Sequence, residues 1–206
     1  KIIDENIKPS EAPLTGITAP ANGPIFIEDA EKGDTLKIEI KSVLPRGKQP
    51  RGTTCLIQNF GGLTGTDESP TLNPPLPELV KKVSVTTEGV VWSEKITFPY
   101  RPFIGTIGTS PQIDSINTLT PEKHGGNMDL PDVCPGNILY LPIEVEGALL
   151  YLGDCHAVQG DGEISGCAIE IASYTTIKVE VLKRKILKWP RLESNNFIMS
   201  IGRARP

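Results

Sequence analysis

The sequence predicts a mainly β protein, in which antiparallel sheets pack as in a β-sandwich and are joined by long Gly/Pro-rich loops with little helix. Three observations support this prediction. The 20 glycines and 19 prolines are spread along all 206 residues and separate short β-branched runs, as is typical of all-β proteins. Residues 35–43 alternate between apolar and polar side chains, which is the period of a half-buried strand. No segment shows the period of an amphipathic helix.

The first expected strands follow an N-terminal segment that contains several prolines. Pro9, Pro13 and Pro20 disfavour a helix through this region, because proline has no N–H to donate and its ring blocks the preceding turn. A strand is expected at residues 24–28 and a second at 35–43, after a glycine turn. In the second strand, apolar side chains face one way and charged side chains the other, which indicates one buried and one solvated face. The apolar residues are Leu36, Ile38 and Ile40, and the charged residues are Lys37, Glu39 and Lys41.

The middle of the chain combines loops with short strands. Residues 61–77 contain four prolines, so we expect a long loop there, and long loops within a domain are often functional. Strands are expected at 82–87 and 90–98, joined by a hairpin turn at Glu88-Gly89. Residues 101–111 contain glycines whose spacing does not match a nucleotide-binding fingerprint. We interpret this stretch as a tight backbone segment.

The second half is richer in strand signals. Glu146-Gly147 is expected to turn the chain between two of its apolar runs. No internal repeat divides the sequence, so we expect a single β-rich domain over residues 1–206. The four apolar runs that predict further strands cover residues 138–145, 148–152, 164–171 and 175–182.

Charge and composition argue against several kinds of partner. The net charge is −4 and the isoelectric point is about 5.3, so we expect neither nucleic acid nor an anionic membrane as a partner. No apolar run approaches the length that spans a bilayer, and the polar first residues do not resemble a signal peptide. The four cysteines form no C-x-x-C pair and no disulfide framework. A reduced, cytoplasmic setting is the simplest expectation.

Both histidines of the chain lie in glycine-rich segments beside carboxylates. One segment reads His124-Gly125-Gly126-Asn127-Met128-Asp129, and the other reads Gly153-Asp154-Cys155-His156-Ala157-Val158-Gln159-Gly160-Asp161-Gly162-Glu163. Histidine can bind a metal or carry a proton near neutral pH, and glycine lets a ligand approach the backbone closely. These two segments therefore carry the candidate site.

Strand geometry suggests how the second segment could form a site. Asp154 and His156 are two residues apart, so they share one face of the strand if the strand persists. Asp161 and Glu163 are also two apart, and a hairpin would bring all four side chains to one end of a sheet. Such a group could bind a divalent metal through histidine and aspartate while one carboxylate stays free as a general base.

Simpler interpretations stay open for each of these residues. Asp161 could cap a Gly-Asp-Gly turn, and His156 could be a histidine that donates to Asp154. His124 could belong to an ordinary loop. Cys155 could act as a nucleophile, but neighbouring residues of a strand point to opposite faces, so we favour the metal hypothesis over this one.

The same segments resemble the acetamidase/formamidase family. The string from Gly153 to Glu163, preceded by Leu141-Pro142 and by residues 145–149, is similar to the signature block of this family. Residues 124–129 and 103–108 resemble two further motifs, and residues 23–28 with 33–36 resemble its early segment. The matches occur in the family order and cover about residues 20–182. Compared with the family, the sequence lacks an opening β segment and a C-terminal helical region.

This resemblance implies a β-sandwich-like fold, metal dependence and a homo-oligomer, most simply a dimer. It implies hydrolysis of short aliphatic amides such as formamide or acetamide to the acid and ammonia. Two alternatives stay open. One is a non-catalytic or incomplete β module of the same family that needs a partner chain. The other is a hydrolase of a different amide, for example a cyclic one.

We hypothesise that the metal ligands are His124, Asp154 and His156. Zinc is the first candidate, because two imidazoles and a carboxylate suit it, whereas calcium or magnesium would fit a site dominated by oxygen ligands. Glu163 is the candidate general base, which would take a proton from water and deliver it to the departing ammonia.

Supporting roles fall to neighbouring groups in the same segments. Asp161 and Asp129 would orient the ligands or the attacking water. The backbone N–H groups of Gly125 and Gly126 would stabilise the oxyanion that forms as the amide is attacked.

Overall fold

The computed structural model describes residues 20–64 and 74–202, which form strands, turns and loops without a helix. Within these ranges, therefore, no helix is long and apolar enough to cross a membrane. The chain divides into two compact units. The first unit comprises residues 44–64, 74–102 and 156–173, and the second comprises 20–43, 103–155 and 174–202.

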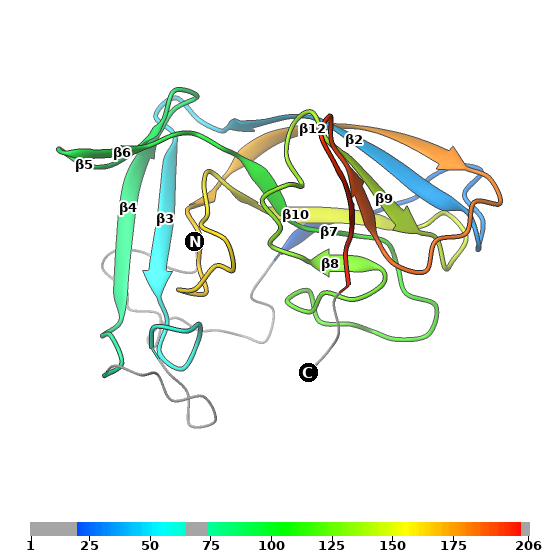
Figure 1. Ribbon diagram of the computed structural model, residues 1–206, viewed down its shortest axis with the longest axis horizontal. Coiled ribbons are helices and arrows are strands. Elements are labelled where there is room, and N and C mark those ends of the chain that lie inside the picture. The colour runs from blue at the N-terminus through cyan, green and yellow to red at the C-terminus, as the bar shows by residue number, and fades with distance from the viewer. Residues whose placement is uncertain (1–19, 65–73, 203–206) are drawn as a thin grey trace. The chain divides into compact units, whose positions relative to one another are not determined.

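A strongly twisted antiparallel sheet forms the first unit. At its centre β3 (Arg51–Leu56) and β4 (Leu79–Val85) lie side by side (Figure 1), paired from Arg51 opposite Ser84 to Leu56 opposite Leu79. β5 (Val90–Ser93) and β6 (Ile96–Phe98) extend the sheet beyond β4, and β11 (Glu170–Ile171) pairs with the other edge of β3. A small core covers this sheet, formed by Val83, Val85, Val90, Ala157 and Ile169.

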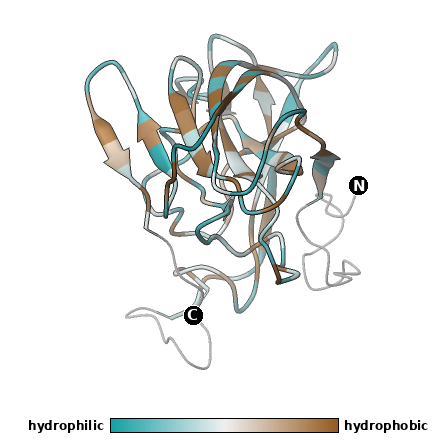
Figure 2. Cartoon of the chain, turned by 90° about the vertical axis from the view of Figure 1, so that its right-hand side faces the viewer, coloured by the Kyte–Doolittle hydropathy of each residue, from teal (hydrophilic) through white to brown (hydrophobic). Residues whose placement is uncertain are grey.

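The second unit contains a five-stranded sheet in the order β12-β2-β9-β13-β14. β2 (Thr35–Pro45) pairs with β9 (Ile138–Pro142) from Thr35 opposite Pro142 to Glu39 opposite Ile138. On β2 the apolar residues Leu36, Ile38 and Ile40 are at most 1% exposed, which confirms the predicted alternation. Short bands of hydrophobic and hydrophilic residues alternate along the strands (Figure 2). The remaining strands are β12 (Ser173–Leu182), β13 (Arg191–Glu193) and β14 (Ile198–Ser200).

Further strands of the second unit position two of the predicted site carboxylates. β7 (Phe103–Gly108) lies between β10 (Leu150–His156) and β8 (Gly125–Asn127). β1 (Ala21–Ile25) pairs antiparallel with β10. All six residues of β7 are buried, so this strand is the centre of that part of the unit.

The prediction of a mainly β fold is confirmed, but five strands were not expected from the sequence. Residues 101–111 were interpreted as a tight backbone segment, yet they contain β7. Because both faces of β7 are buried, its sequence shows no alternation that could have revealed it. β3 was missed because Thr53 and Thr54 interrupt its apolar pattern. β8, β13 and β14 span three residues each, too few for a period to show.

Several expected strand boundaries also differ from the structure. The strand expected at 164–171 is mostly irregular, and only Glu170 and Ile171 belong to β11. The strand expected at 90–98 is interrupted by a turn between β5 and β6. The hairpin turn at Glu88-Gly89 is confirmed, since the N–H of Thr86 donates to the carbonyl of Gly89 at 2.9 Å. Of the loop expected at 61–77, residues 65–73 lie outside the described residues.

Candidate metal centre and neighbouring pocket

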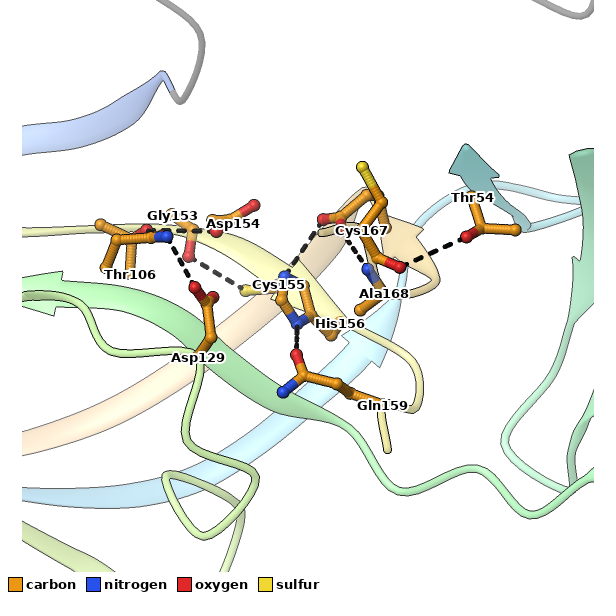
Figure 3. Close-up of polar contacts among 12 residues, drawn as sticks. Thr54, Thr106, Asp129, Gly153, Asp154, Cys155, His156, Gln159, Cys167 and Ala168 are labelled. Carbon is orange, nitrogen blue, oxygen red and sulfur yellow. Dashed lines mark hydrogen bonds and ion pairs between the residues drawn. The ribbon is translucent and has the colours of Figure 1, made fainter. Parts of the chain in front are cut away.

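His156 ends β10 and enters the first unit almost fully buried, with 1% of its surface exposed. Each ring nitrogen faces an oxygen atom. Nδ1 lies 2.9 Å from Oε1 of Gln159, and Nε2 lies 3.2 Å from Oε2 of Glu170. In Figure 3 the Gln159 side chain points directly at the imidazole of His156. The ring is therefore held from both sides by residues of its own unit.

The contact with Gln159 fits a tautomer of His156 in which Nδ1 carries a proton. The Gln159 oxygen that faces Nδ1 is a carbonyl oxygen, which accepts, so Nδ1 donates in this arrangement. In the neutral imidazole this leaves the lone pair of Nε2 directed at the carboxylate of Glu170. Two electron-rich atoms in contact require a cation or a proton between them. Metal-binding histidines usually have this arrangement, with the distal N–H donated to a side-chain or backbone oxygen.

Glu163 joins the same group from the loop that follows His156. One ligand atom from each of His156, Glu163 and Glu170 lies within 4.8 Å of the others. Glu163 has a φ of +45°, a conformation that few non-glycine residues adopt and that is often found at functional sites. Two turns hold it there, since its N–H donates to Gly160 at 3.2 Å and its carbonyl accepts from Gly166 at 2.7 Å.

The cluster of His156, Glu163 and Glu170 fits a divalent metal ion by its chemistry. The imidazole of His156 and the carboxylate of Glu170 are ligands that zinc accepts, with the Glu163 carboxylate beside them, and the oxygen atoms also suit calcium or magnesium. Two ligands bound tetrahedrally to one zinc ion at about 2.1 Å would lie about 3.4 Å apart. The separation of Nε2 and Oε2 is 3.2 Å, close to that value. Glu170 is half-buried, so the cluster is accessible from one side.

A pocket of about 590 Å³ adjoins this cluster within the first unit. Glu163 and Gln159 form part of its polar lining, together with Asp161 and Thr54. The rest of the wall is mostly apolar. It includes Leu63, Trp92, Phe98, Val158, Ile164 and Ile169.

In the second unit, Asp129 and Asp154 converge on β7 at Gly105. A Cβ atom added to Gly105 would lie 2.8 Å from Oδ1 of Asp129 and 3.0 Å from Oδ2 of Asp154. Both aspartates have positive φ angles, +46° and +53°. The Thr106 hydroxyl lies 3.2 Å from Oδ2 of Asp154 and also within hydrogen-bonding reach of Asn127, whose amide donates to Oδ2 of Asp129 at 2.6 Å (Figure 3).

The sequence predicts that Asp154 and His156 share a face if the strand continues between them. β10 does run from Leu150 to His156 and includes both residues, although the φ of +53° at Asp154 is not that of a regular extended strand. His156 and Glu163, in contrast, are connected by turns rather than by the expected hairpin.

His124 is buried in the second unit, with 1% exposure. Its ring packs against Tyr151, with the ring centroids 6.3 Å apart and the planes tilted by 31°. Burial raises the pKa of Tyr151 to about 12, so this phenol stays protonated at neutral pH. Among the described residues of this unit, no group of three potential ligand atoms within 4.8 Å includes His124, and its role as a ligand stays a prediction.

Other predicted roles meet different outcomes. Asp161 is exposed at the pocket, outside the group of ligand atoms around His156, and its orienting role stays a prediction. The N–H of Gly125 donates to the Glu122 carbonyl at 2.9 Å, so it is not available for an oxyanion. Cys155 is buried, with its sulfur 3.5 Å from the Thr175 hydroxyl, and no contact supports a nucleophilic role.

Two residues of the site were not assigned by sequence reasoning. Glu170 belongs to an apolar run and lies 14 positions after His156, with no pattern that links them. Gln159 lies within the predicted motif, but the sequence assigns no role to it. A carboxylate within an otherwise apolar run was the one available signal for Glu170, because a buried charge needs a partner.

Comparison with known proteins supports the resemblance found in the sequence. The chain matches the model of the acetamidase/formamidase family over residues 11–117 and 113–206. It is 30% identical over 222 aligned residues to a protein of Schizosaccharomyces pombe that carries the name formamidase, covering 80% of this chain.

Solved structures agree with this match. An acetamidase from Yersinia enterocolitica is 54% identical, covers 100% of the chain and superimposes with a TM-score of 0.93. An acetamidase from Bacillus halodurans is 38% identical over 95% of the chain, with a TM-score of 0.83. The chain spans 52% of the S. pombe protein and 62% of each of these two structures.

Proposed function

Because this chain belongs to the acetamidase/formamidase family, we propose that it hydrolyses short linear amides to the carboxylate and ammonia with the help of a divalent metal ion. Relatives named formamidase or acetamidase support amide hydrolysis as the reaction. The observation that carries the proposal is the convergence of His156, Glu163 and Glu170 beside a pocket.

In this proposal, His156 and Glu170 hold the metal, and zinc is the first candidate. Gln159 keeps the Nδ1 proton in place, so that Nε2 presents its lone pair to the ion. When bound there, the ion would polarise the amide carbonyl and acidify water. Formamide or acetamide would be the smallest substrates.

Glu163 is the proposed general base and acid. Its carboxylate takes a proton from the attacking water as the new carbon–oxygen bond forms. It then gives that proton to the amide nitrogen, so that the carbon–nitrogen bond breaks and neutral ammonia leaves. Proton transfer of this kind typically contributes about a hundred- to ten-thousand-fold to the rate. The half-buried position of Glu163 on the pocket wall suits this role.

The second unit carries the other predicted site residues. We propose that Asp154 and His124 are further metal ligands and that Asp129 orients Asp154, supported by the convergence of the two carboxylates on Gly105. These assignments are tested separately, by the metal content of Asp154→Asn, His124→Ala and Asp129→Asn proteins. Wild-type metal content in the first two variants would remove the ligand roles of Asp154 and His124.

The proposed function is tested by ammonia release from formamide and acetamide. We expect release that a chelator abolishes and that added zinc restores. Glu163→Gln is expected to bind metal and fold normally while losing most of the turnover, whereas Glu146→Gln, at an exposed position, should behave as wild type. His156→Ala should lose the metal. Full activity of Glu163→Gln would remove its role, and unchanged metal in His156→Ala would make His156 structural.

The same assay separates the alternative functions. A folded chain that binds metal but releases no ammonia from any amide would favour a binding module that works with a partner chain. Release from cyclic amides alone would replace the linear substrates of the proposal. We also propose a homodimer in the cytoplasm. None of the four cysteines forms a disulfide, although the sulfurs of Cys55 and Cys167 lie 3.1 Å apart, and free thiols support a reducing compartment. Light scattering of the purified chain tests the dimer.

A further inference from the structure

The pocket beside Glu163 is far larger than the smallest substrates require. Acetamide has four non-hydrogen atoms and occupies on the order of 100 Å³, on a scale of about 30 Å³ per water molecule. The pocket measures about 590 Å³, within the range of about 300–1,000 Å³ typical of sites for much larger ligands. Acetamide would therefore leave most of it filled with water.

Part of the pocket wall offers accessible apolar and aromatic surface. Phe98 is 38% exposed, Leu63 37% and Ile164 63%, and all three line the pocket. Trp92 packs edge-to-face against Phe98, with ring centroids 5.9 Å apart at an angle of 64°. Lys81 Nζ lies over the Trp92 ring, 4.8 Å from its centroid. The exposed part of Phe98 is therefore the aromatic surface against which a further ring can pack face-on or edge-on.

Polar groups line the same pocket. Glu163, Gln159 and Arg101 belong to its lining, and Gln159 contacts His156 directly. An amide group placed at Glu163 would extend its acyl body along the apolar wall. Burying that body removes apolar surface of both partners from water, which favours binding.

We infer that the first unit accepts primary amides whose acyl group carries an apolar body about the size of an aromatic ring, held against Trp92, Phe98 and Ile164. This inference rests on the proposed amide hydrolysis and names its substrate class. Formamide and acetamide remain substrates, but they use only the part of the pocket beside Glu163.

Kinetics with acetamide and phenylacetamide test the inference, because the two amides differ only by the ring. We expect kcat/KM of the wild-type chain to be higher for phenylacetamide, mainly through a lower KM. Phe98→Ser should lower the ratio of the two kcat/KM values by about tenfold, as expected for loss of apolar contact in a pocket. Phe197→Ser removes an equally exposed phenylalanine outside the pocket, at 42% against 38%, and should leave the ratio unchanged.

A binding measurement separates failure of the pocket from failure of the reaction. The chain has two tryptophans, so a Trp189→Phe variant reports on Trp92 alone. Phenylacetamide should change the Trp92 fluorescence saturably, and acetamide should not. Hydrolysis of acetamide without binding or turnover of phenylacetamide would overturn the inference. Saturable binding of phenylacetamide without hydrolysis of any amide would support the pocket and contradict the proposed reaction.

Discussion

The side chain of Gln159 decides which nitrogen of His156 can face a ligand. Its carbonyl oxygen, 2.9 Å from Nδ1, holds the proton on that nitrogen and so leaves Nε2 with a lone pair next to Glu170. A residue that never touches the metal can thus determine whether the imidazole is ready to bind it. The position of one proton on the His156 ring thus affects whether Nε2 can bind a metal.

Replacing Gln159 with alanine is therefore expected to weaken zinc binding by about 10- to 100-fold, because the imidazole loses both its orientation and its tautomer preference. Isothermal titration with zinc measures this change. Gln112→Ala, at an exposed position, removes the same group elsewhere and should have no effect. Zinc affinity within twofold of wild type in the Gln159 variant would contradict the role.

A second single-residue prediction concerns Asp34, which is 4% exposed. Burial by itself would raise its pKa. The Lys183 ammonium 2.8 Å away and the N–H groups of Arg184 at 2.8 Å and Glu31 at 3.0 Å outweigh burial, so the pKa of Asp34 lies below its usual value. A lowered folded-state pKa stabilises the fold above the unfolded pKa of about 4, and this contribution is lost as pH falls through the folded value.

Asp34→Asn should consequently lower the free energy of unfolding by about 1–3 kcal/mol at pH 7. The difference from wild type should shrink steadily below about pH 4. Urea titrations of both proteins at several pH values measure this difference in the free energy of unfolding. Asp29→Asn removes an equal charge from an exposed residue nearby and serves as the control. A difference that stays constant down to pH 2 would show that the ion pair is not its source.

At the scale of elements, β7 acts as the support for two carboxylates. Asp129 and Asp154 reach over this strand because Gly105 has no side chain. Residues on both sides of Gly105 are buried, so the strand cannot shift to make room. Its φ is not in the positive range, so an alanine there would be unstrained in its backbone and would act through the added methyl group alone.

The added methyl group of Gly105→Ala would lie 2.7 Å from the backbone carbonyl oxygen of Asp154 and close to both carboxylates. We therefore expect Gly105→Ala to displace the backbone of Asp154 together with the two carboxylates, and to reduce amide turnover at least tenfold if Asp129 and Asp154 serve the reaction as proposed. Circular dichroism and ammonia release measure the two effects. Gly202→Ala adds a methyl group where nothing lies within 4 Å and should change neither. Wild-type turnover in folded Gly105→Ala protein would argue against a role for either aspartate.

At the scale of the whole molecule, strand partners come from distant parts of the chain. β3 pairs with β4 nearby, but its other neighbour β11 places Thr53 opposite Glu170. β2 likewise pairs with β9, with Thr35 opposite Pro142. Each such pairing requires a long loop to close before any contact forms. The fold therefore depends on non-local contacts in both units.

Refolding should in consequence be slow, with rates in the millisecond-to-second range or slower. Stopped-flow dilution from denaturant, followed by tryptophan fluorescence, measures this rate. Complete refolding in less than about one millisecond would show that local contacts dominate instead. Trp92 and Trp189 lie in different units, so single-tryptophan variants report the rate of each unit.

Local pattern was sufficient for the class of the fold and for the neighbourhood of the site. The alternation along β2 and the turn before Gly89 could be predicted because both depend on residues close in sequence. The family also followed from a continuous motif, which contains the candidate site residues His156 and Glu163. Such features need no knowledge of which strands pair.

Only the tertiary structure decided the composition of the cluster and the shape of its surroundings. Glu170 meets His156 because of how the loop between them folds, and that path depends on contacts with β3. The positive φ of Asp154, inside β10, is likewise not readable from the sequence pattern. β7 escaped prediction because burial on both faces removes alternation. Sequence patterns record which side of an element is buried, whereas a site depends on which elements meet.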